Sequence, residues 1–157
     1  MVKKIVKIVV ILLAVAFVII QFIRPDRTNP AEDPSQTLEA STQIPDDVRM
    51  ILSRSCADCH SNRTAYPWYS NVAPVSWFLN DHINEGRREL NISVWNTYEP
   101  KKKARKLGEI CEQVEKGEMP LPSYLWIHWD ARMQPGDAKR LCEWAEGEKD
   151  KIESAPQ

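Results

Sequence analysis

The sequence predicts an all-α protein, and three observations support this prediction. Glycine is scarce, with 5 in 157 residues, so few positions favour a turn over a helix. Runs of β-branched residues end within the first 23 residues. Beyond them, apolar residues recur every three or four positions, and no stretch alternates between apolar and polar residues as a half-buried strand would. We therefore expect helices packed around one core.

The first segment is a continuous apolar run. It extends over residues 5–23 and is broken only by Lys7 and Gln21, which is close to the roughly 20 residues that cross a bilayer as a helix. A cleaved signal peptide is the alternative, but its apolar region is usually shorter and ends in small residues. Here bulky residues continue up to Arg24. We expect residues 1–24 to be an uncleaved transmembrane helix with a cytoplasmic amino terminus, because lysines precede the run.

The remaining chain divides into three parts. Residues 25–43 alternate prolines with polar and acidic residues, which predicts a flexible tether. Residues 44–151 are the expected folded domain, and residues 152–157 a disordered tail. Without the first 23 residues, which hold three lysines and no acid, the formal charge changes from −1 to 18 minus 22, or −4. This balance supplies no dense basic face and therefore argues against nucleic acid as a partner.

Four helices are expected in the folded domain. They begin near Pro45, Pro74, Pro100 and Pro135, because proline suits the first turn of a helix. Their predicted inward faces consist of Val48, Ile51, Leu52 and Ser55; of Val75, Phe78, Leu79 and Ile83; of Ala104, Leu107, Ile110, Cys111 and Val114; and of Ala138, Leu141, Cys142 and Ala145.

The stretch Cys56-Ala57-Asp58-Cys59-His60 follows the first of these helices. Two cysteines separated by two residues and followed at once by histidine is the arrangement used for covalent haem attachment. We therefore expect one haem c, bound through thioethers to Cys56 and Cys59, with His60 as the first axial ligand of the iron. A redox-active dithiol or half of a zinc site is the alternative without haem. The first would be expected in a βαβ context, and the second would need another ligand pair nearby.

The second axial ligand has few candidates. Met119 is favoured, because it lies just past a predicted helix end, on a segment that Pro120 stiffens. His128 and His82 are the other candidates, and the sixth position could also be open. A loop methionine that fills a gap in the core is the purely structural interpretation of Met119.

Three further groups of residues carry predictions. Cys111 and Cys142 lie on the inward faces of two helices, where they either pack as small apolar residues or form a disulfide. The lysine-rich start of the third helix is a solvated face or a docking patch for an acidic partner. An aromatic group is expected to shield the haem, namely Tyr66, Trp68, Tyr69, Trp77 and Trp95.

These motifs together resemble the bacterial haem-binding domain family, a group of small membrane-anchored proteins with a cytochrome c-like pattern. The matching segments are Cys56–Ser61, Tyr66–Ser70, Val72–Trp77, Gly86–Arg87, Leu90–Asn91, Trp95, Gly117–Pro120 and Tyr124–Ala131. The resemblance covers roughly residues 44–145. It implies an all-α, cytochrome c-like domain around one haem, with His60 and Met119 as axial ligands, facing the periplasm from the inner membrane of a bacterium.

The expected function is one-electron transfer through a haem with histidine and methionine ligands. Its partners would be a redox protein in the periplasm or membrane and, through the first helix, the lipid bilayer. A haem enzyme of peroxidase type, or a haem-based sensor, is the alternative, and it requires an open or exchangeable sixth position. The pattern favours an electron carrier over a catalyst.

Overall fold

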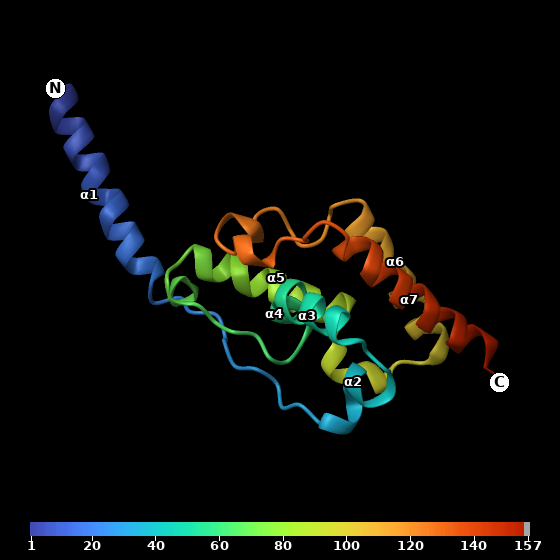
Figure 1. Ribbon diagram of the computed structural model, residues 1–157. Helices are drawn as coiled ribbons and strands as arrows, with labels where there is room; N and C mark the ends of the chain where they lie inside the picture. The colour runs from blue at the N-terminus through green and yellow to red at the C-terminus, as the bar shows by residue number, and fades with distance from the viewer. Residues whose placement is uncertain (156–157) are drawn as a thin grey trace.

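The computed structural model describes residues 1–155, and over this range the protein is built from helices without any strand (Figure 1). The all-α prediction is therefore confirmed. The α-helices are α1 (Val2–Ile20), α2 (Leu38–Ser41), α3 (Asp46–Ser55), α4 (Ala57–His60), α5 (Val75–Glu89), α6 (Pro100–Glu115) and α7 (Asp137–Ser154). Between them lie the 3-10 turns η1 (Pro34–Gln36), η2 (Trp68–Asn71), η3 (Ile92–Thr97), η4 (Tyr124–Trp126) and η5 (Trp129–Ala131).

The N-terminal helix α1 projects from the body of the molecule (Figure 1). Within residues 1–155, no helix combines the length and the apolar character that crossing a membrane requires. The predicted transmembrane helix is therefore wrong, and so is the prediction of a single-pass protein of the inner membrane. The physical reason is that Lys3, Lys4 and Lys7 lie inside α1. They leave an uninterrupted apolar stretch of residues 8–20, which spans only about 20 Å as a helix.

The core lies where α3 packs against the pair formed by α6 and α7. These two helices lie side by side (Figure 1). The predicted inward faces of α3, α6 and α7 are confirmed, with only Ile110 and Ala138 partly exposed. On α5 the prediction is wrong in part, because Val75 and Phe78 are 43% and 53% exposed while Ile83 is buried. The apolar residues at the start of α5 thus face away from the core.

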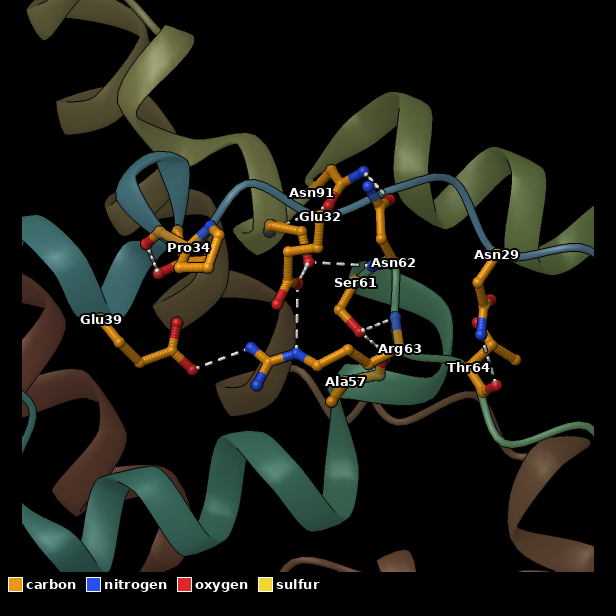
Figure 2. Close-up of polar contacts among 12 residues, drawn as sticks. Asn29, Glu32, Pro34, Glu39, Ala57, Ser61, Asn62, Arg63, Thr64 and Asn91 are labelled. Atoms are coloured by element: carbon orange, nitrogen blue, oxygen red, sulfur yellow. Dashed lines mark hydrogen bonds and ion pairs between the residues drawn. The ribbon is translucent and has the colours of Figure 1, made fainter.

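Residues 25–43 were expected to be a flexible tether, but they pack along the domain. Leu38 of α2 is 1% exposed and belongs to the core. Figure 2 shows the polar part of this contact, where the Arg63 guanidinium lies 3.2 Å from Glu32 and 3.0 Å from Glu39. Asn29 donates a hydrogen bond to the Thr64 carbonyl at 3.0 Å. Because these partners lie far apart in the sequence, composition alone did not reveal the packing.

The C-terminal end also differs from the expected disordered tail over 152–157. Helix α7 continues to Ser154, and Ile152 packs against the core. Residues 156 and 157 lie outside the described range.

Candidate haem site

Helices α3 and α4 place the Cys-x-x-Cys-His motif at the edge of the core. Buried apolar residues anchor α3, and the backbone then changes direction at Cys56 (φ −126°, ψ −39°). The His60 amide donates to the Cys56 carbonyl at 2.9 Å. Helix α4 is therefore a single turn, and His60 lies one helical turn after Cys56. This turn places Cys56 and His60 on one cavity, whereas Cys59 lines a separate small void.

The imidazole of His60 is held at one nitrogen only. Its Nδ1 lies 3.0 Å from the carbonyl oxygen of Gly86 and 3.0 Å from that of Leu90. Since both partners only accept hydrogen bonds, Nδ1 carries the proton and Nε2 keeps a free lone pair, which is the form that binds a metal. Burial lowers the pKa of His60, although the two carbonyls act in the opposite direction. The ring is therefore neutral at physiological pH.

A cavity of about 460 Å³ lies beside this ring, between α3, the end of α5 and α6. It has the size of a typical cofactor site. Cys56, His60 and Met119 all line it. Its apolar wall consists of Leu52, Leu90, Ile92, Ile110 and Val114, and its charged rim of Glu89, Lys106, Glu109 and Glu112.

Both motif cysteines are unpaired thiols. Burial raises the pKa of Cys56 to about 12 and that of Cys59 to about 11. Redox-active dithiols and zinc-binding cysteines need the opposite, a stabilised thiolate. In the chain without a bound cofactor, both thiols are therefore protonated at neutral pH.

The structure separates the three candidates for the second axial ligand. Met119 lines the cavity of His60, and its backbone amide donates to the Gln113 carbonyl at 3.2 Å. His82 lies on the exposed side of α5, where its Nδ1 is 2.8 Å from the Phe78 carbonyl. His128 lines a separate small void on the side of Cys59.

His128 belongs to an aromatic cluster next to the motif. Its Nε2 is hydrogen-bonded to the Tyr69 hydroxyl, and its ring stacks on Tyr124 with centroids 4.2 Å apart. Tyr124 in turn donates to the Asp58 carboxylate at 2.7 Å. Burial and this hydrogen bond raise the pKa of Tyr124. The Nε2 atom of His128 thus contacts Tyr69, and His128 is not among the residues that line the cavity of His60.

Cys111 and Cys142 form a disulfide between α6 and α7, with an S–S distance of 2.09 Å. Their sulfur atoms and the Glu115 carboxylate make up the group of potential metal ligands found within residues 1–155. Since the disulfide leaves neither sulfur as a thiolate, this group lacks the donors that a metal site needs.

Lys106 is the cavity residue that sequence analysis missed. It belongs to the lysine-rich start of α6, which was expected to be a solvated face or a docking patch for an acidic partner, but it is 4% exposed. Its Nζ lies 2.6 Å from Glu109 and 3.3 Å from Glu89. Burial raises the pKa of Glu109, but the hydrogen bond and charge of Lys106 outweigh it and the pKa is lowered overall. The sequence holds one signal for this burial: Lys106 precedes the inward-facing Ile110 by one helical turn, so both residues lie on the same face of the helix.

The predicted aromatic shield is not found around the cavity of His60. Trp68 is 79% exposed, and Trp95 is buried in the core. Neither of them, nor Tyr66, Tyr69 or Trp77, is among the residues that line the cavity of His60. Its walls are aliphatic instead.

The residues present fit a haem. The cavity offers an apolar wall for a porphyrin, a free imidazole nitrogen and a neighbouring thiol. It is also lined by Ser55, whose buried hydroxyl has no hydrogen-bond partner within residues 1–155. A buried polar atom without a partner is costly, so this hydroxyl favours a polar ligand group beside it.

Comparison with known proteins points to the same cofactor. Residues 15–147 match the sequence profile of one protein family, described as a haem-binding domain. No curated protein and no solved structure matches the chain. The matched range includes the Cys-x-x-Cys-His motif, the residues that line the cavity of His60, and residues 25–43, which pack along the domain.

Proposed function

Because the chain belongs to the haem-binding domain family, we propose that it is a mono-haem c-type cytochrome that transfers single electrons. The haem would be attached through Cys56 and Cys59, and its iron would be held by His60 and Met119. The observation that carries this proposal is that His60, Met119 and Cys56 line one cavity.

The two ligand side chains have complementary roles. His60 presents the free lone pair of Nε2, since its Nδ1 is committed to two carbonyls. Met119 offers a soft thioether that needs no proton and is compatible with an apolar wall. When bound, the haem would supply a one-electron couple, and a methionine thioether among its protein ligands would raise its potential. With both axial positions filled by protein, a small-molecule substrate would have no direct access to the iron.

The surrounding residues favour exchange of electrons over chemistry on a substrate. One wall of the cavity is aliphatic, and an apolar shell limits the access of solvent to a metal site and tunes its redox potential. Lys106 and Glu109 pair with each other at 2.6 Å, so neither is free as a general acid or base. The partner would be another redox protein that donates or accepts the electron.

An absorption spectrum tests this proposal. The full chain is expressed together with a haem-attachment system, purified and reduced, and carbon monoxide is added. We expect a c-type spectrum that carbon monoxide leaves unchanged, because Met119 occupies the sixth position. A prompt spectral shift would instead support the enzyme or sensor alternative, and a protein without covalent haem would contradict the proposal altogether.

A further inference from the structure

The last turn of α5 approaches the motif more closely than a side chain would allow. A Cβ atom added at Gly86 would lie 2.8 Å from the Cys59 carbonyl oxygen and 3.1 Å from the Cys59 Cβ. The closer of these contacts is with the backbone, so no side-chain rotation could relieve it. By contrast, a Cβ atom added at Gly108 in α6 would meet nothing within 4 Å. The absence of a side chain at Gly86 therefore sets how near α5 lies to the haem motif.

This close approach brings the negative end of α5 to His60. The carbonyls of Gly86 and Leu90 both accept from Nδ1 at 3.0 Å. Leu90 follows α5 as its C-cap residue, where carbonyls lack partners within the helix and the macrodipole concentrates partial negative charge. The Gly86 carbonyl also accepts from the Leu90 amide at 2.9 Å, whereas the Leu90 carbonyl lies beyond the last helical hydrogen bond. Both acceptors face one N–H group, so the imidazole is oriented and made more electron-rich.

The same turn also holds the chain that follows His60. The Arg87 guanidinium donates to the Ser61 carbonyl and to the Thr64 hydroxyl, each at 2.9 Å. The ring of His60 is thus held by Gly86 and Leu90, and the backbone of the next residue, Ser61, is held by Arg87.

We propose that the last turn of α5 is a positioning device for the iron ligand, and that Gly86 is the residue that makes it possible. The turn fixes the proton on Nδ1 and leaves Nε2 facing the cavity. It also strengthens the imidazole as an electron donor, which stabilises the oxidised iron and lowers the midpoint potential. This inference rests on the proposed function for its effect on potential, but the hydrogen bonds themselves belong to the protein without haem.

The first experiment therefore uses the full chain without haem. A long-range nitrogen–proton NMR spectrum of the histidine side chains reports which ring nitrogen carries the proton. We expect His60 to be locked in the Nδ1–H form. A proton on Nε2, or fast exchange between the two forms, would overturn the positioning role whether or not the protein binds haem.

The second experiment compares Gly86→Ala with the control Gly108→Ala. In the haem-loaded protein, Gly86→Ala should shift the midpoint potential to more positive values, and without haem it should lower the population of the Nδ1–H form. Gly108→Ala should change neither quantity, because alanine suits a helix interior with free space. Equal potentials in Gly86→Ala and the wild type would overturn the inference.

The two proposals fail in distinguishable ways. If the wild type acquires no covalent haem while His60 keeps its Nδ1–H form, the proposed function is wrong but the positioning of the ring stands. If Gly86→Ala does not fold, the wild-type NMR spectrum still decides, since it needs no variant.

Discussion

The two proposed iron ligands lie in halves of the molecule that hold them by different means. His60 belongs to the half formed by α3, α4 and α5, where hydrogen bonds to two backbone carbonyls fix its ring. Met119 belongs to the half formed by α6, α7 and their connection, where its side chain packs against the core. A thioether is only a weak hydrogen-bond acceptor, so packing alone directs it. Polar contacts thus preorganise the first ligand, and the shape of its surroundings preorganises the second.

Removing the attachment thiols should have the largest effect. In the variant with Cys56→Ala and Cys59→Ala, no thioether can form, so covalent haem should be lost entirely. Denaturing gel electrophoresis with a haem stain, together with the mass of the intact chain, measures this loss. The control is the double variant Cys111→Ala and Cys142→Ala, which should keep its haem. Haem that stays covalently bound without Cys56 and Cys59 would contradict the assignment of the motif.

Replacing the second ligand tests the other half. Met119→Ala should leave haem attached through His60 but open the sixth position, so that the reduced protein binds carbon monoxide and the midpoint potential falls. Carbon monoxide titration followed by absorbance measures the change. His128→Ala and His82→Ala are matched controls that should stay closed. If only one of these histidine variants opens the site, Met119 is not the ligand.

The disulfide tests whether the Met119 half depends on its cross-link. Cys111 and Cys142 are 31 positions apart, and closing a loop of this length stabilises a protein by roughly 3 to 4 kcal/mol. The free energy of unfolding of the double alanine variant should therefore be lower by that amount, and the variant should unfold at a lower denaturant concentration. Loss of methionine ligation should precede loss of histidine ligation in the same titration. Simultaneous loss of both in the variant would show that the two halves do not differ in this way.

An exposed ion pair between the halves should have the smallest effect. Asp47 of α3 and Arg140 of α7 lie 2.5 Å apart, and the Arg140 hydrogen bond lowers the pKa of Asp47 from its ordinary 3.8. A lowered pKa in the folded state contributes stability above the ordinary value, which is lost as the pH falls through the lowered one. Asp47→Asn should thus be slightly less stable than the wild type at pH 7.

The pH dependence provides the control for that small effect. The difference between Asp47→Asn and the wild type should shrink once the pH falls below 3.8, as the unfolded and then the folded carboxylate take up a proton. Urea midpoints measured from pH 7 downwards test this. A difference that does not change with pH would mean that the pair contributes nothing through charge.

Sequence alone predicted the elements that depend on local periodicity. The buried faces of α3, α6 and α7 follow from apolar spacing, and the motif identified the cofactor before any contact was known. Leu38 and Lys106 were misjudged, because their burial depends on segments far away in the chain. Phe78 was misjudged for a related reason, since periodicity shows that a helix has an apolar face but not which neighbour covers it. The first segment was misjudged because its length was counted without the cost of its lysines.

The contact between α5 and Cys59 also has a consequence for how related sequences can be sorted. A position that admits no Cβ tolerates only glycine as long as the helix keeps its approach. Gly86 follows His60 by 26 positions. In a relative that carries the same Cys-x-x-Cys-His motif, the residue at the corresponding position tells whether its helix can lie as close. Glycine there would mark the members whose histidine is held by the last turn of this helix. Any larger residue would mark a histidine held in another way.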